Sequence, residues 1–228
     1  MDWWPILNTI LERYRWRGPK HISKDPFKTL IGCILSQRTR DETTDAAFER
    51  LFSKYKGVED LSKADPAEIE KLIYPVGFYR VKARRIVEAA RFIRDVFGGK
   101  VPDNMEDLLR IPGVGRKCAN IVLAYGFGKP AIAVDTHVYR VSKRLGIVSE
   151  NADVVEVEET LKRIVPKERW IDVNHALVRF GKDVCRPTRP LCEKCPVREH
   201  CTFYLTSNTL KRDLRPRISR TELKKRRK

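Results

Sequence analysis

The sequence predicts an all-α fold, and three features of its patterning support that class. Apolar residues recur three and four positions apart over most of the 228-residue chain. Proline and aspartate stand together where helical runs begin, at Asp65-Pro66 and at Pro102-Asp103, as is typical of a first helical turn and its cap. The only strand-like run, Ala131-Ile-Ala-Val134, is four residues long and fits an extended connection equally well.

The helical runs follow one another along the chain. The first covers residues 27–35, where the apolar side chains at helical spacing are Phe27, Leu30, Ile31, Ile34 and Leu35. The next comprises Ile86, Ala89, Ala90, Ile93 and Phe97, and a later one comprises Leu161, Ile164 and Val165. No clean internal repeat is present, although residues 76–83 and 114–119 both read as a glycine turn that leads into a basic helix.

Composition and charge indicate where the protein acts and what kind of molecule it binds. Hydrophobic residues make up 42% of the chain, which allows a core, and no apolar run of about 18 residues could span a membrane. The first residues lack a basic segment followed by an apolar one, so we expect no secretion signal and a location inside the cell. The net charge of +17 suggests a polyanionic partner. The alternative is the charged surface of a thermophile protein, which the single glutamine, Gln37, also fits.

Part of this charge lies at the C-terminus. Residues 211–228 hold ten lysines and arginines against two acidic residues, Asp213 and Glu222. Because few apolar residues occur there, residues 206–228 are predicted to be a disordered basic tail. The tail either touches phosphates or is a solvated end, and the sequence favours neither.

Residues 111–117, Ile-Pro-Gly-Val-Gly-Arg-Lys, form a turn between two helical runs. Gly113 and Gly115 permit positive φ and leave backbone N–H groups bare at the start of the next helix, where a phosphate would bind. Val114 is expected to anchor the turn in the core. A plain helix–helix turn is the alternative, but Arg116 and Lys117 in so basic a chain favour phosphate binding. The segment resembles the helix–hairpin–helix motif of DNA repair proteins.

Four of the six cysteines are closely spaced in a C-x6-C-x2-C-x5-C pattern: Cys185, Cys192, Cys195 and Cys201. Inside a cell this pattern favours a metal centre over disulfides. Zinc sites usually have two C-x2-C knuckles, so the single knuckle favours iron–sulfur without excluding zinc. The flanking cations either dock a phosphate backbone or offset the charge of a thiolate cluster (Arg186, Arg189, Lys194 and Arg198). Cys33 and Cys118 fall in helical runs and are expected to be buried or inert.

Lys117 and Asp135 are candidate catalytic residues because of what they offer together. Alone, a lysine at a helix start is usually a phosphate contact, and an aspartate there is usually a cap. Together they fit removal of a damaged base, because a carboxylate stabilises a cation-like transition state at the sugar carbon. A neutral lysine amine can attack that carbon to form a Schiff base, and β-elimination of the 3′ phosphate then cuts the strand. Arg116 is the candidate cation whose closeness would favour the neutral amine.

Five segments, taken in order, resemble the endonuclease III family of base-excision DNA glycosylases and strand-cutting lyases. They are Leu-Ser-Gln-Arg-Thr-Arg-Asp at 35–41, Val-Gly-Phe-Tyr at 76–79, the turn at 111–117, Ala-Val-Asp-Thr-His-Val-Tyr-Arg-Val at 133–141, and the four-cysteine loop. The interval from Lys117 to Asp135 and the cysteine pattern both agree with the family. The likeness covers roughly residues 5–205.

The resemblance implies a two-lobed helix–hairpin–helix glycosylase fold. One lobe is a six-helix barrel at residues 20–130, with the hairpin at about 108–126. The other comprises residues 1–19 and 131–205 and carries a [4Fe-4S] cluster on the four cysteines. The catalytic residues are implied to lie at the mouth of the cleft between the lobes. The implied substrate is double-stranded DNA with oxidised pyrimidines, such as thymine glycol, or abasic sites.

The resemblance also assigns roles residue by residue. Lys117 is the nucleophile and Asp135 the assisting carboxylate, and the damaged nucleotide is flipped out of the stack. The gap is filled by a wedge near Gln37 and Arg38 on one side and by Phe78 on the other. The family places a glutamine where Arg38 aligns, so either Gln37 or Arg38 could fill the gap. The other expected DNA contacts are Gly113, Val114, Gly115, Arg116 and His137.

Two other glycosylase branches and one non-catalytic function are alternatives to the strand-cutting enzyme. Adenine glycosylases lack a lysine at position 117, need a glutamate where this chain has Cys33, and carry an extra C-terminal domain. Thymine mismatch glycosylases usually lack the lysine too, so Lys117 favours the strand-cutting branch. A non-catalytic DNA-binding module with a structural metal is the alternative from another class. The resemblance further implies a monomer in the prokaryotic cytoplasm, associated with the nucleoid.

Overall fold

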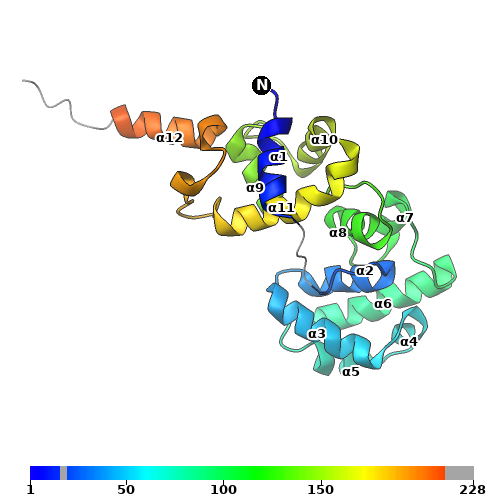
Figure 1. Ribbon diagram of the computed structural model, residues 1–228. Coiled ribbons are helices and arrows are strands. Elements are labelled where there is room, and N and C mark those ends of the chain that lie inside the picture. The colour runs from blue at the N-terminus through cyan, green and yellow to red at the C-terminus, as the bar shows by residue number, and fades with distance from the viewer. Residues whose placement is uncertain (16–19, 214–228) are drawn as a thin grey trace, which may run out of the picture.

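The computed structural model describes residues 1–15 and 20–213, with side chains as far as residue 207. Every regular element in these ranges is helical, which confirms the predicted all-α class (Figure 1). The α-helices are α1 (Trp4–Arg13), α2 (Pro26–Ser36), α3 (Asp41–Lys54), α4 (Val58–Ser62), α5 (Pro66–Ile73), α6 (Tyr79–Phe97), α7 (Met105–Arg110), α8 (Arg116–Ile121), α9 (Thr136–Leu145), α10 (Val154–Ile164), α11 (Trp170–Asp183) and α12 (Thr202–Asp213). A π-helical turn, η1 (Val122–Gly126), continues α8, and the short 3-10 turns are η2 (Lys167–Arg169), η3 (Cys192–Lys194) and η4 (Arg198–His200).

Capping side chains set where the helices begin. Asp65 accepts a hydrogen bond from the Ala67 backbone and Pro66 stands in the first turn of α5, as the sequence predicts. The second predicted start, at Pro102-Asp103, is wrong. Asn104 caps α7 instead, since its side chain accepts from the Asp107 backbone at 3.0 Å, while the Asp103 carboxylate pairs with Lys129 at 2.6 Å.

Two hydrophobic clusters divide the helices into two lobes. We call α2–α8 with η1 the first lobe and α1 with α9–α12 the second, and Figure 1 shows the two groups side by side. Residues 131–134 lie extended between them, and their side chains alternate: Ala131 and Ala133 pack in the first cluster, Ile132 and Val134 in the second. The period of two is that of an extended chain, so this strand-like run serves as a seam between two cores. The predicted domain boundaries stay a prediction.

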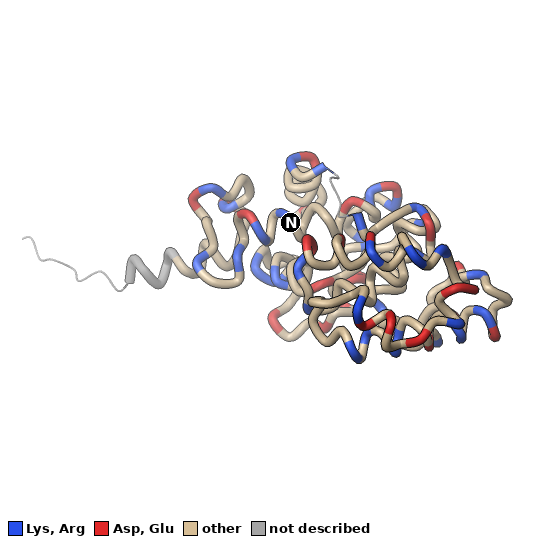
Figure 2. Tube along the Cα trace, turned by 90° about the horizontal axis from the view of Figure 1, so that it is seen from below, with Lys and Arg blue, Asp and Glu red and all other residues tan. Residues whose placement is uncertain are grey.

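The helices α2 and α6 form the centre of the first lobe. Eight of the eleven residues of α2 are buried, and α2 approaches the preceding loop so closely that a Cβ on Gly32 would lie 2.1 Å from the His21 carbonyl oxygen. Figure 2 shows lysines and arginines along both lobes, interspersed with aspartates and glutamates. No helix in the described part of the chain is long and apolar enough to cross a membrane.

The predicted basic tail begins inside a helix, because α12 continues to Asp213. Residues 214–228, which hold most of the tail's cations, lie outside the described residues.

Candidate active site

A pocket of about 610 Å³ lies where the two lobes meet, and it brings the predicted catalytic pair together. Its walls come from the loop before α2, from α2 and α3, from α8, and from α9 and α11. Lys117, Asp135 and His137 all line it. Lys117 comes from the first lobe and the other two from the second, so both lobes contribute to the site.

Lys117 is the second residue of α8, directly after the glycine turn. Its side chain is exposed, while its neighbours Cys118 and Ala119 are buried against the first core. The helix therefore presents the lysine to the pocket by anchoring its other face.

Arg116 does not serve as the neighbouring cation that the sequence suggested for Lys117. Its guanidinium donates to Glu158 of α10 at 2.7 and 3.1 Å. Glu158 is 1% exposed, and Asn120 and Lys162 also donate to it, at 3.0 and 2.7 Å. The guanidinium of Arg116 is attracted to this buried carboxylate, whereas a position beside the Lys117 ammonium would be repulsive. The ion pair therefore connects α8 to α10 of the second lobe.

Asp135 caps α9 with one oxygen and faces the pocket with its carboxylate. Its Oδ1 accepts from the backbone N–H groups of His137 and Val138, both at 2.9 Å. Its Oδ2 has no hydrogen-bond partner among the described residues. The aspartate thus fills the structural role that is usual at this position and keeps an oxygen for chemistry.

His137 is held as a neutral ring. Its Nδ1 accepts from the Arg140 guanidinium at 3.1 Å, and burial lowers the pKa of the imidazole despite the nearby Asp135 carboxylate. Gly181 makes room for this arrangement, because a Cβ there would lie 2.7 Å from the same nitrogen. The hydrogen bond from Arg140 and the burial of the ring therefore both favour the neutral form of His137 at the pocket wall.

The glycine turn has the predicted positive φ at Gly113 but not at Gly115, whose φ is −102°. The Val114 N–H donates to the Ile111 carbonyl at 3.1 Å, with Pro112 and Gly113 between them and Gly113 at φ 83°. A proline followed by a positive-φ glycine is the pattern of a type II turn. The Val114 side chain is buried, as expected, so only its backbone faces outward. Within the described chain the N–H groups of Gly113 and Gly115 make no hydrogen bond, and a Cβ on Gly115 would meet only open space.

The predicted wedge residues lie on two neighbouring turns. Gln37 is tied to the glycine turn, since its side-chain amide donates to the Gly113 carbonyl at 3.2 Å. Arg38 and Phe78 are both exposed and both have positive φ, 52° and 59°, which is uncommon for large side chains. The Arg38 guanidinium lies 5.8 Å from the centre of the Phe78 ring. Arg38 and Phe78 thus project as a pair, while Gln37 is held within the protein.

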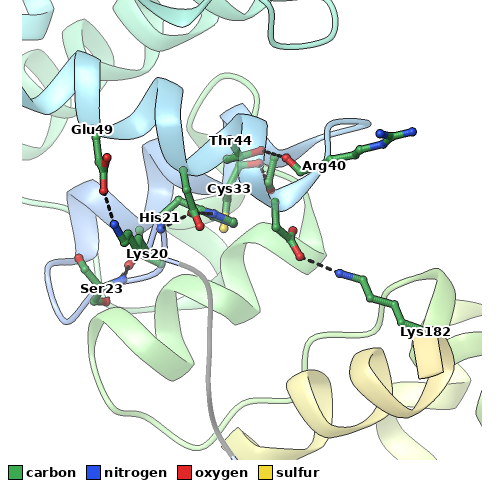
Figure 3. Close-up of polar contacts among 12 residues, drawn as sticks. Lys20, His21, Ser23, Cys33, Arg40, Thr44, Glu49 and Lys182 are labelled. Atoms are coloured by element: carbon green, nitrogen blue, oxygen red, sulfur yellow. Dashed lines mark hydrogen bonds and ion pairs between the residues drawn. The ribbon is translucent and has the colours of Figure 1, made fainter. Parts of the chain in front are cut away.

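Charged residues that sequence reasoning missed line the opposite wall of the pocket. Asp41 at the start of α3 pairs with Lys182 of α11 at 2.7 Å, an ion pair between the lobes (Figure 3). Buried His21 bonds Asp45 of α3 at 2.6 Å beside the same pocket. No local pattern distinguishes these residues, because only the tertiary fold brings α3, α11 and the residues before α2 to one pocket.

The four clustered cysteines line a second, smaller pocket in the second lobe. It is bounded by α9, α11 and the 185–201 loop, and none of its thiols forms a disulfide. The loop is docked by two arginines of α9. Arg140 donates to the Cys185 carbonyl at 3.0 Å, and Arg144 donates to its Sγ at 3.5 Å and to the carbonyls of residues 186 and 187. The cation beside the sulfur suits a site where thiolates gather.

Comparison with known proteins identifies the family. The model of the HhH-GPD superfamily of base excision DNA repair proteins matches residues 31–167. Endonuclease III of Thermotoga maritima is 50% identical over 184 residues, covering 81% of this chain and 86% of that protein. The chain belongs to the endonuclease III family. Endonuclease III of Bacillus subtilis is 42% identical, covering 79% of this chain and 82% of that protein.

Solved structures agree with the assignment to the endonuclease III family. A trapped covalent intermediate of an endonuclease III with DNA superposes with a TM-score of 0.83 at 38% identity, covering 89% of this chain and 95% of that one. A thermostable thymine-DNA glycosylase superposes almost as well, with a TM-score of 0.82 at 33% identity over 89% of this chain and 96% of that one. The backbone is thus shared across branches, and the side chains at the pocket must distinguish this endonuclease III family member from the mismatch enzymes.

Proposed function

We propose that this protein is a bifunctional DNA glycosylase and abasic-site lyase that removes oxidised pyrimidines from double-stranded DNA and cuts the strand. The observation that carries the proposal is the shared pocket: Lys117 and Asp135 line one cavity, next to a turn with unpaired backbone N–H groups. The family relatives are named endonuclease III, and the solved relatives are bound to DNA. The non-catalytic alternative gives no reason for an exposed lysine and a carboxylate to share a pocket.

The proposed chemistry divides between the two residues. As the glycosidic bond breaks, C1′ of the sugar becomes cation-like, and the free Oδ2 of Asp135 stabilises that charge. The Lys117 amine attacks C1′, the base departs with the electrons of the glycosidic bond, and the sugar ring opens to a Schiff base. A proton is then lost from C2′, the 3′ phosphate leaves with the C3′–O electrons, and water later releases Lys117. His137 is proposed to contact the DNA strand through a neutral ring, which would not attract a phosphate away from the glycine turn.

The wedge is assigned to Arg38 and Phe78. Gln37 already bonds the Gly113 carbonyl, whereas Arg38 and Phe78 are exposed and adjacent. A flipped nucleotide leaves a gap in the stack that a guanidinium plane and an aromatic ring can fill from two sides. The N–H groups of Gly113 and Gly115 bind the phosphate beside the lesion.

The four cysteines are proposed to hold a [4Fe-4S] cluster. In the described ranges no three His, Cys, Asp or Glu side chains are grouped as a single metal ion requires. All four cysteines instead line one pocket, and four thiolates around a shared space are the donor set of an iron–sulfur cluster. Bound there, the cluster would cross-link the 185–201 loop to α9 and α11 and so shape a basic surface for DNA. We further propose that the protein acts in the prokaryotic cytoplasm as a monomer.

Borohydride trapping tests the function directly. Incubated with a duplex containing thymine glycol and then reduced, the wild type should form a covalent adduct and nick the strand, whereas Lys117→Met should do neither. Lys63→Met, which removes an exposed lysine of the first lobe, is the matched control and should behave as wild type. A Lys117→Met variant that still nicks would place the nucleophile elsewhere. Base release from G·T or G·U pairs without cutting would instead indicate a mismatch glycosylase.

A further inference from the structure

Lys82 is a buried lysine that the chemistry above does not use. It lies in α6 and is only 3% exposed. Its ammonium donates to the carbonyls of Leu35 at 2.7 Å and Gln37 at 2.5 Å and to the Thr39 hydroxyl at 3.0 Å. Three acceptors match the three N–H bonds of an ammonium. No carboxylate pairs with it in the described chain, and burial lowers its pKa to about 8.

Packing alone does not account for a lysine at this position. An ammonium taken out of water costs free energy that hydrogen bonds must offset, whereas a methionine of similar length would fill the same space at no such cost. The three hydrogen bonds of the ammonium therefore indicate that its charge has a specific structural role. All three acceptors belong to the segment where α2 ends and turns toward α3, which is the turn that projects Arg38.

The same turn is fastened to the turn that carries Phe78. The Thr39 hydroxyl that accepts from Lys82 also accepts from the Gly77 backbone N–H at 3.2 Å. The two backbones are in contact there, because a Cβ on Gly77 would lie 2.9 Å from the Arg38 carbonyl oxygen. Lys82 thus lies under both turns, and Thr39 is the link between them.

We propose that Lys82 is a positioning residue for DNA distortion: it holds the 37–39 turn against the 77–78 turn so that Arg38 and Phe78 enter the duplex as one rigid wedge. The inference rests on the proposed function, because it presumes that these two side chains fill the gap left by the flipped nucleotide. Opening a stacked duplex requires a wedge that does not yield, and two positive-φ turns would relax if nothing fixed them.

Two substrates separate wedging from chemistry. The first is a duplex with a tetrahydrofuran abasic analogue opposite 2-aminopurine, whose fluorescence reports unstacking. The second is a single-stranded abasic oligonucleotide, which needs no wedge and reports Schiff-base chemistry by borohydride trapping. Lys82→Met should lose the fluorescence rise and bind the duplex about ten-fold more weakly, while trapping on the single strand stays within about two-fold of wild type.

Thr39 supplies a second test that does not depend on a buried charge. Thr39→Val breaks the link between the turns and should reduce the fluorescence rise, whereas Thr39→Ser keeps the hydroxyl and should restore it. This pair decides the matter if Lys82→Met does not fold. Wild-type unstacking by Lys82→Met, equal losses on both substrates, or Thr39→Val matching Thr39→Ser would each overturn the proposal. If the wild type does not trap on the single-stranded abasic oligonucleotide, the proposed lyase fails, but the fluorescence comparison on the duplex still tests Lys82.

Discussion

Asp135 is expected to have two separable roles, and two substitutions at this position distinguish them. One oxygen caps α9 through two hydrogen bonds of 2.9 Å, and the other is available to the sugar. Asp135→Asn keeps an acceptor for the cap but removes the negative charge, whereas Asp135→Ala removes both. Asparagine and aspartate are about equally good N-caps, while alanine is a poor one.

The two effects differ in size. Asp135→Asn loses only the interaction of the charge with the helix dipole, about 0.3–1 kcal/mol. Asp135→Ala loses the cap as well, about 1 kcal/mol more. In a chain of this length 1 kcal/mol lowers Tm by about 2–4 °C, so the alanine variant should melt a few degrees below the asparagine variant. Both should release the damaged base on the order of 10²-fold more slowly, because both lack the charge that stabilises the transition state.

The assays are thermal denaturation and single-turnover base release from a thymine glycol duplex. Cleavage at a preformed abasic site is the internal control, because no glycosidic bond remains to be broken there, and it should be affected less. Wild-type base release by Asp135→Asn would refute the electrostatic role. Equal melting temperatures for the two variants would refute the capping role.

Three further predictions concern the charges and thiols around the site. Burial raises the pKa of Glu158, but the hydrogen bonds from Arg116 and Lys162 lower it by more, so the net pKa lies below the usual 4.5. The free energy by which the ionised carboxylate stabilises the fold is therefore fully present above pH 4.5 and is lost as the pH falls through the lowered pKa. Glu158→Gln should therefore cost about 3 kcal/mol in urea denaturation at pH 7 and progressively less as the pH falls below 4.5 and through the lowered pKa, and a pH-independent cost would contradict this. Cys195→Ser should lower the iron content and visible absorbance of the purified protein, and unchanged iron would exclude this ligand. Asp41→Asn, which breaks an exposed ion pair with Lys182, should change stability by less than about 1 kcal/mol in thermal melts, and a larger loss would show that the lobes depend on it.

Local patterns predicted the features that depend on local conformation. The type II geometry at Pro112-Gly113 follows from residues whose own φ preferences require it, and the cap at Asp135 follows from its place before a helix. The helical class follows from periodicity alone, and the relatives confirm the family that the motifs indicated. Lys117 and Asp135 came together in the structure because each lies at a helix start that faces the seam between the lobes.

The ion pair between Arg116 and Glu158 could not be predicted from the sequence. Arg116 and Lys117 are adjacent cations at a helix start, and nothing local shows that one turns to a carboxylate 42 positions later while the other faces the pocket. The helix period decides it: consecutive residues of α8 point about 100° apart, so only one can face the cleft. Which one depends on where α10 packs, and that is a tertiary fact.

Lys82 of the first lobe and Glu158 of the second are buried charges with similar surroundings. Glu158 accepts from three side chains and Lys82 donates to three acceptors. Each lies behind a short element that we propose contacts DNA, α8 in one case and the 37–39 turn in the other. Buried side chains such as Cys118 and Ala119 anchor one face of α8, and the hydrogen bonds of a buried ion then fix the orientation of each element further. Charge-assisted hydrogen bonds are directional where apolar contacts are not, so they can set that orientation, although burying the charge costs stability. The two buried ions therefore lie behind the elements proposed to contact DNA, and we expect an apolar replacement at either position to misalign the bound DNA in any variant that still folds.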